Sequence, residues 1–154
     1  MIKLKQTYFD SGELDSEVVE INRKKEGEYK KYYPNGNLYI VCNYINDKQN
    51  GQYKEYHSNG QLYEICNCIE GKLSGEYKIY YKNGQLKSIY NYVNDKINGE
   101  YKSYYDNGQI MESCNFTNGK YNGEYKSYYE NGQLKEIVNY IDGKINAESL
   151  TRLN

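Results

Sequence analysis

Hydrophobic and polar residues alternate along most of the chain, and short glycine-containing segments interrupt the alternation at regular intervals. In the stretch 38–44, apolar side chains occupy every second position, at Leu38, Ile40, Cys42 and Tyr44. Side chains of a strand point in turn to its two faces, so this spacing predicts a strand with one apolar face. Similar stretches recur along the chain. We therefore expect an all-β protein without substantial helix.

The interruptions repeat with a period of 24 residues. Such a period is typical of tandem repeat proteins, whose end copies are often degenerate. We expect a single repeat domain over 1–154. It comprises a degenerate N-terminal copy (3–26), five repeats (27–50, 51–74, 75–98, 99–122 and 123–146) and a C-terminal end (147–154). In that end, Ala147 and Ser149 replace the glycine and the tyrosine of the repeat.

Two turn signals occur in each repeat, and together they predict how its strands pair. Asn35-Gly36 favours a two-residue type I′ hairpin turn, and Asn46-Asp47 marks a second turn. The first turn predicts the pairs Tyr33–Leu38, Lys31–Ile40 and Tyr29–Cys42, and the second predicts Tyr44–Gln49, Cys42–Gly51 and Ile40–Tyr53. Both registers place the same residues on one face. The sequence thus predicts an elongated antiparallel β-meander of hairpin repeats, folded as a single-layer twisted sheet.

The two faces of this sheet differ in chemistry. The apolar face carries Tyr29, Tyr33, Leu38, Ile40, Cys42, Tyr44 and their equivalents, and the other carries Glu28, Lys30, Tyr32, Asn43 and theirs. On the apolar face, glycine at position 51 is expected to leave room for a neighbouring ring. On the polar face Glu and Lys alternate, and the net charge is −1. Nucleic acids and anionic lipids favour a patch of one sign, so this pattern argues against both.

Neither the cysteines nor the only histidine forms a motif typical of catalysis or metal binding. Cys42 and Cys66 are expected two strands apart, roughly 9.6 Å, whereas a disulfide needs Cα atoms within about 7 Å. His57 replaces a tyrosine of the repeat and has no nucleophile beside it in the sequence. We expect buried thiols, no metal, no cofactor and no enzymatic activity. No signal peptide or membrane-spanning run is seen, which predicts a cytoplasmic protein.

The repeat unit resembles a known family. The segment G-E-Y-K-I-Y-Y-K-N-G-Q-L-K at 75–87 is similar to the MORN repeat variant found in bacterial proteins. The resemblance implies tandem β-hairpins, and it extends to antitoxins of the YwqK type in toxin–antitoxin systems. MORN proteins more broadly imply scaffolding and contact with membrane lipids.

Tyrosine, with 22 copies, is the residue that suggests a function. Its large ring and polar tip favour protein interfaces. We expect another protein as the partner, bound by an antitoxin-like or immunity-type chain across the middle repeats. The alternative is a membrane-surface or cell-wall-associated scaffold that binds lipid or glycan. Stacking between hairpins or self-association would also occupy the rings. The predicted binding residues are Tyr53, Tyr77, Tyr81, Tyr101 and Tyr105.

Overall fold

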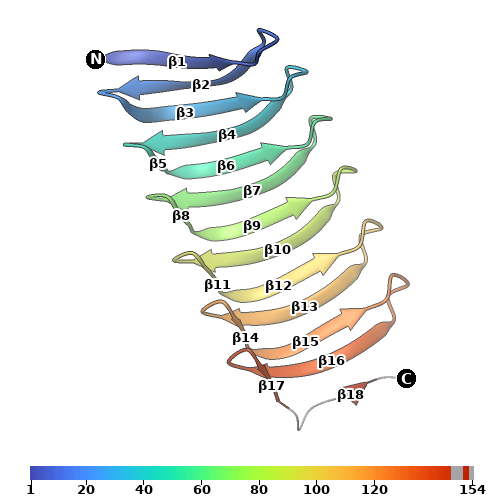
Figure 1. Cartoon of the computed structure of the whole chain (residues 1–154). Coiled ribbons are helices and arrows are strands. Elements are labelled where there is room, and N and C mark those ends of the chain that lie inside the picture. Colours follow the sequence, from blue (N-terminus) through green and yellow to red (C-terminus); the bar gives the residue numbers. More distant parts are fainter. Residues whose placement is uncertain (147–150, 153–154) are drawn as a thin grey trace. The chain divides into compact units, whose positions relative to one another are not determined.

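The computed structural model describes residues 1–146 and 151–152, in which strands and turns occur without any helix (Figure 1). The all-β prediction is therefore confirmed, and these residues contain no helix that could cross a membrane. Contacts group the chain into two units, 1–74 and 75–154. The single repeat domain stays a prediction. The substitutions proposed at Ala147 and Ser149 lie outside the described residues.

Each unit is an antiparallel sheet in which strands that follow one another along the chain are neighbours (Figure 1). The first unit contains β1 (Ile2–Tyr8), β2 (Leu14–Ile21), β3 (Lys24–Tyr32), β4 (Leu38–Ile45), β5 (Lys48–Gln49), β6 (Gly51–Tyr56), β7 (Leu62–Ile69) and β8 (Lys72–Leu73). The second contains β9 (Gly75–Tyr80), β10 (Leu86–Val93), β11 (Lys96–Ile97), β12 (Gly99–Tyr104), β13 (Ile110–Thr117), β14 (Lys120–Tyr121), β15 (Gly123–Tyr128), β16 (Leu134–Ile141), β17 (Lys144–Ile145) and β18 (Thr151–Arg152).

The Asn-Gly turns differ from the predicted type I′ geometry. The Tyr33 N–H donates to the carbonyl of Asn37 at 2.8 Å, so the loop between them contains three residues. Within it Gly36 has a positive φ of 82°, whereas Asn35 does not. A three-residue hairpin loop of this kind combines a type I turn with one left-handed residue. The asparagine contributes through its side chain, since Asn35 Oδ1 accepts the Asn37 N–H at 3.0 Å.

This longer loop changes the pairing next to the turn and leaves the rest of the hairpin as predicted. Leu38 pairs with Tyr32, so the predicted Tyr33–Leu38 pair is wrong. A bulge between Lys31 and Tyr32 then absorbs the difference. Beyond it, the predicted Lys31–Ile40 and Tyr29–Cys42 pairs are confirmed.

The type I′ geometry occurs instead at the second turn of each repeat. Asn46 and Asp47 have φ of 51° and 67°, Ile45 pairs with Lys48 across this turn, and the predicted Tyr44–Gln49 pair next to it is confirmed. Positive φ at both central residues recurs at Asn22-Arg23, Glu70-Gly71, Asn94-Asp95, Asn118-Gly119 and Asp142-Gly143. Because type I′ turns match the right-handed twist of the flanking strands, they connect neighbouring hairpins without splaying them.

The register beyond this turn is shifted by two residues from the predicted one. Ile40 pairs with Glu55, so the predicted Ile40–Tyr53 and Cys42–Gly51 pairs are wrong. The cause lies between β5 and β6, where the Asn50 N–H donates to the Asn43 carbonyl at 2.9 Å and Gly51 has a φ of 96°. A shift of two residues between β4 and β6 leaves the pairing residues of these two strands on the same faces as the predicted register.

Glycine at position 51 is therefore explained by backbone conformation. A Cβ atom added to Gly51 would meet no atom within 4 Å, so the prediction that this glycine leaves room for a neighbouring ring is wrong. Its positive φ is a conformation that other residues adopt only with strain. The equivalent glycines share both properties, at Gly27, Gly75, Gly99 and Gly123.

Successive hairpins are also joined by hydrogen bonds between their turns. At one end, N–H groups of the type I′ turns donate to the preceding hairpin, as from Gly71 to the Gln49 carbonyl and from Gly119 to the Ile97 carbonyl, both at 2.8 Å. At the other end, Asn107 Nδ2 donates to the Glu130 carbonyl at 3.2 Å. The asparagine of the Asn-Gly pair thus stabilises its own turn and contacts the next one.

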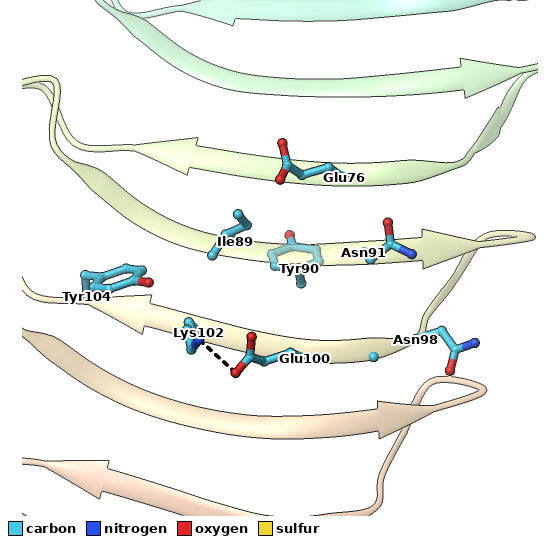
Figure 2. A pocket seen from close by; sticks show the side chains of 9 residues that line it. Glu76, Ile89, Tyr90, Asn91, Asn98, Glu100, Lys102 and Tyr104 are labelled. Carbon is cyan, nitrogen blue, oxygen red and sulfur yellow. Dashed lines mark ion pairs between the residues drawn. The ribbon is translucent and has the colours of Figure 1, made fainter.

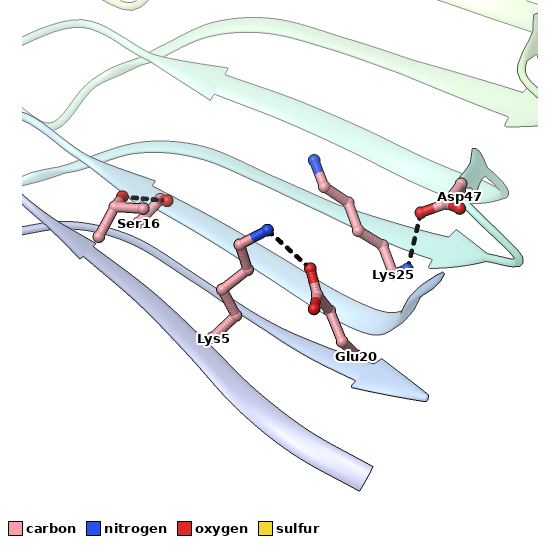
Figure 3. A network of polar contacts seen from close by, with 6 residues as sticks. Lys5, Ser16, Glu20, Lys25 and Asp47 are labelled. Atoms are coloured by element: carbon pink, nitrogen blue, oxygen red, sulfur yellow. Dashed lines mark hydrogen bonds and ion pairs between the residues drawn. The ribbon is translucent and has the colours of Figure 1, made fainter. Parts of the chain in front are cut away.

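An ion pair and a hydrogen bond to a side chain join the first strands of the first unit (Figure 3). Lys5 Nζ lies 2.8 Å from Glu20 Oε1, which links β1 to β2. The Lys25 N–H donates to Asp47 Oδ1 at 2.8 Å, which attaches the turn after β4 to β3. Every residue of β1 is exposed, so this strand is held by its backbone ladder to β2 and by such polar contacts rather than by burial.

Replacing Glu70 by Asn is expected to stabilise the protein. Glu70 has a φ of 51°, and asparagine tolerates the left-handed region better than glutamate. The free energy of unfolding should rise by about 0.5–1 kcal/mol in urea titrations. Glu70→Ala removes the same charge without relieving the strain of the positive φ, and it serves as the control. Equal effects of the two substitutions would contradict the conformational explanation.

Candidate binding face of tyrosine residues

One face of each sheet carries the repeated tyrosines, and we call it the tyrosine face. The most buried apolar residues lie on it, with at most 4 % of their surface exposed, at Val18, Cys42, Cys66, Cys68, Cys114 and Val138. All but Cys68 occupy one position of the 24-residue repeat. These small side chains form a thin core along the strands, and the aromatic rings lie beside them.

In the second unit the rings form a continuous series of contacts, which we call the aromatic array. Tyr77 stacks on Tyr90, with ring centroids 5.0 Å apart and planes inclined by 14°. Centroid distances between neighbouring rings range from 4.5 to 6.3 Å. Such contacts add stability beyond the area they bury. The array consists of Tyr77, Tyr90, Tyr92, Tyr101, Phe116, Tyr121, Tyr125 and Tyr140.

Of the five predicted binding residues, two belong to this array. Tyr77 and Tyr101 both contact Tyr90, so the structure brings them together. Tyr53 lies in the first unit, where its hydroxyl donates to Glu55 Oε2 at 2.9 Å. All three rings are half-buried, and each retains exposed surface.

The other two predicted residues have a structural role. The Tyr81 hydroxyl donates to the Tyr104 carbonyl at 2.7 Å, and the Tyr105 hydroxyl donates to the Tyr128 carbonyl at 2.8 Å. Tyr33 makes the same bond to Tyr56 in the first unit. Each bond joins one hairpin to the next, which accounts for tyrosine at this position without any ligand. Both rings are also half-buried, so their part in binding stays a prediction.

Our sequence reasoning missed carboxylates on the tyrosine face. The position represented by Ile40 holds Glu64, Glu112 and Glu136 in other repeats. The Tyr125 hydroxyl donates to Glu112 Oε2 at 2.9 Å. Burial, followed by the negative charge of Glu112, raises the pKa of Tyr101 to about 12. A consensus sequence hides these carboxylates, whereas the residues found at this one position in each repeat reveal them.

Glu112 belongs to a row of polar residues that runs from β10 to β16 at one register position. The pairs Ser88–Ser103, Ser103–Glu112, Glu112–Ser127 and Ser127–Glu136 define this polar row. Ser103 is 2 % exposed, and its hydroxyl has no hydrogen-bond partner among the described residues. An unsatisfied buried hydroxyl costs roughly 1–3 kcal/mol.

The opposite face carries charge pairs within single strands. Lys102 Nζ lies 2.8 Å from Glu100 Oε1, and Figure 2 shows both on β12 beside an open hollow of about 440 Å³. Side chains of both signs and neutral groups line this hollow, including Glu76, Ile89 and Asn91. Exposed pairs of this kind contribute little to stability. The face therefore presents a mixed, solvated surface.

His57 and the cysteines are involved in packing. The His57 ring lies 4.9 Å from that of Tyr63, as expected for a substituted packing position. All four cysteines are buried thiols, without a disulfide among them. Within the described residues, no group of His, Cys, Asp and Glu side chains has the arrangement needed to hold a metal ion.

Alkaline pH is expected to destabilise the protein through its buried thiols. Burial, with a smaller contribution from Glu112, raises the pKa of Cys114 to about 12. The folded chain therefore holds this proton more tightly than the unfolded chain, whose thiols have a pKa of about 8.5. The stabilising contribution is complete below about pH 8.5 and is lost as the pH rises towards 12.

Cys114→Val tests this effect, because Val138 occupies the equivalent position. Between pH 8 and pH 10, the unfolding free energy of the wild type should fall by roughly 1–2 kcal/mol more than that of the variant. Urea titrations at the two pH values measure the difference. Identical pH dependence in both proteins would refute the assigned role of the thiol.

Removing the Tyr105 hydroxyl is expected to weaken the connection between hairpins. Tyr105→Phe deletes the donor to the Tyr128 carbonyl and should lower the unfolding free energy by about 0.5–1.5 kcal/mol. Tyr121→Phe is the control, since the Tyr121 hydroxyl makes no hydrogen bond to the residues that the structure describes. Thermal or urea unfolding gives both values, and an equal loss in the control would contradict the assignment.

Comparison with known proteins agrees with this architecture. The model of the MORN repeat variant family matches residues 25–46, 49–67, 73–94, 97–118 and 121–142, which together cover more than half of the chain. Each matched segment contains one Asn-Gly turn with the strands on either side. No curated protein matches the chain. Five successive matches, on hairpins of one repeating geometry, show that the chain belongs to the MORN repeat variant family.

Proposed function

We propose that this protein is a non-enzymatic interaction module that binds another protein through its tyrosine face. The observation that carries this proposal is the aromatic array, whose rings contact one another along the second unit and yet retain exposed surface. Tyr121 is 37 % exposed. Clusters of partly exposed apolar side chains often mark contact surfaces, and tyrosine is enriched among residues that dominate binding energy.

The repeat architecture supports an extended contact surface. Equivalent tyrosines recur in each repeat on the same face, at Tyr77, Tyr101 and Tyr125 in the second unit. Repeat proteins commonly distribute binding over several units. We propose Tyr77 and Tyr101 as the main contacts of this unit and Tyr53 as a contact of the first. Tyr81 and Tyr105 contribute ring surface beside their structural hydrogen bonds.

The absence of enzymatic activity is also part of the proposal. Catalytic sites combine a nucleophile, a base and an orienting group that converge on one point. In this chain most polar side chains follow the repeat, and the only histidine packs on a tyrosine ring. The four thiols suit a reducing compartment, so we propose that the protein acts in the cytoplasm.

A finer proposal is that the chain is an antitoxin or immunity-type protein that neutralises its partner. It is based on the resemblance of the repeat unit to YwqK-type antitoxins. The second candidate is a scaffold at a membrane or cell wall, which the broader MORN class suggests. Co-sedimentation with liposomes and with cell-wall glycan at physiological salt distinguishes the two, because only a scaffold is expected to sediment.

Tyr101→Ala should weaken the capture of a partner from the native host. Truncating a central aromatic contact typically costs 1–3 kcal/mol, so the dissociation constant should rise about 5- to 150-fold. Tyr104→Ala, on the other face of the same strand, is the matched control and should leave binding within about twofold. Pull-down followed by calorimetry with the identified partner measures both. A folded Tyr101→Ala variant that binds like the wild type would place the interface elsewhere.

A further inference from the structure

We propose that the tyrosine face of the second unit binds a basic segment of its partner protein, with a Lys or Arg side chain seated against Glu112, Tyr101 and Tyr125. This inference rests on the proposed function and names the chemistry of the partner. Three separate features of the structure support it: a carboxylate among aromatic rings, an unsatisfied hydroxyl next to it, and a lysine of the chain itself that lies against a pair of tyrosine rings in the first unit.

The first feature is the setting of Glu112. It lies on β13 between the strands that carry Tyr101 and Tyr125, and it accepts the Tyr125 hydroxyl at 2.9 Å. No lysine or arginine forms an ion pair with it among the described residues. A cation is attracted both by a carboxylate and by the faces of aromatic rings. The rings and the carboxylate therefore favour the same kind of ligand.

The second feature is the polar row to which Glu112 belongs. Ser103 pairs directly with Glu112, is 2 % exposed and has an unsatisfied hydroxyl. This hydroxyl is independent of the charge argument and also calls for a polar partner. An ammonium or guanidinium group brings several N–H donors, so it can donate to the Glu112 carboxylate and, where Ser103 becomes accessible, to the Ser103 hydroxyl oxygen.

The third feature is an internal precedent in the first unit. Lys25 Nζ lies 5.0 Å from the ring centroid of Tyr29 and 4.8 Å from that of Tyr44. In the second unit, Tyr101 with Phe116 and Tyr125 with Tyr140 stand at the equivalent positions, and no lysine stands at the equivalents of residue 25. These equivalents are Ile97, Tyr121 and Ile145. A tyrosine pair of this repeat thus accepts an ammonium group. In the second unit the place of Lys25 is taken by Ile97 and by Tyr121, whose ring contacts Tyr125 and Tyr140, so a cation from the partner would meet the rings on the side of Glu112.

The charges of the face decide between kinds of partner. Glu112 and Glu136 repel phosphate groups, which argues against nucleic acids and anionic lipids on this face. A neutral glycan stacks on rings but gains nothing from a carboxylate. Arg is favoured over Lys, because its planar group both stacks on aromatic rings and pairs with carboxylates in a bidentate manner.

Titration calorimetry of the full chain with a hexa-arginine peptide tests the inference. The wild type should bind the peptide, and E112Q should bind it at least tenfold more weakly. E124Q is the matched control, because it removes one carboxylate from the opposite face of the neighbouring strand, and it should stay within twofold of the wild type. E112S is a second variant, with the residue that stands at the equivalent position 88. Circular dichroism and thermal unfolding verify that each variant folds.

The other outcomes are equally informative. Absence of binding to hexa-arginine, or equal weakening in E112Q and E124Q, overturns the inference, since the second result indicates general charge attraction. Binding only to chitin oligosaccharides or to anionic vesicles also overturns it. With the native partner, loss of binding in Tyr101→Ala but not in E112Q or E112S refutes the cation site and leaves the proposed function standing. Loss in none of these variants refutes both.

Discussion

Each hairpin of this protein is stabilised by the hairpin beside it, because a single layer of strands has no second layer against which to bury a core. Contacts between hairpins therefore recur along each of the two units: backbone ladders, turn N–H groups that donate to carbonyls of the preceding hairpin, and tyrosine hydroxyls that donate to the following hairpin, such as Tyr105 to Tyr128. Small side chains such as Cys114 are buried on the face that carries the rings. The repeat is regular because each hairpin must offer the same hydrogen-bonding and packing groups to the next hairpin.

The alternation of side chains was sufficient to predict the strands and their faces. Tyr29 and Cys42 pair as expected, because period-two patterning fixes which residues share a face. The geometry of the turns was harder to predict from the sequence. Asn35-Gly36 favours type I′, but an Asx-type hydrogen bond from Asn37 to the Asn35 side chain stabilises a three-residue loop instead. Local propensity alone does not distinguish the two, since both use glycine in the left-handed region.

The predicted binding residues were separated by contacts that the sequence does not record. Tyr101 and Tyr105 are both repeated tyrosines of one strand region, and nothing in the sequence ranks one above the other. In the structure the hydroxyl of Tyr105 is engaged by a carbonyl, whereas Tyr101 lies among rings beside a carboxylate. Glu112 escaped notice because a consensus averages Ile, Glu and Ser at one position. Variation among repeats therefore carried more information about the site than their similarity did.

The hydroxyl bond from one hairpin to the next has a consequence for how such a chain changes in length. Tyr81 and Tyr105 reach carbonyls 23 residues further on, and their positions are themselves 24 residues apart. Duplication or loss of a whole 24-residue repeat would reproduce the same donors and acceptors at the new junction. An insertion of another length between a donor and its acceptor would break the hydrogen bond. Selection can thus add or remove whole repeats, which lengthens or shortens the surface available to a partner without changing the residues within each repeat.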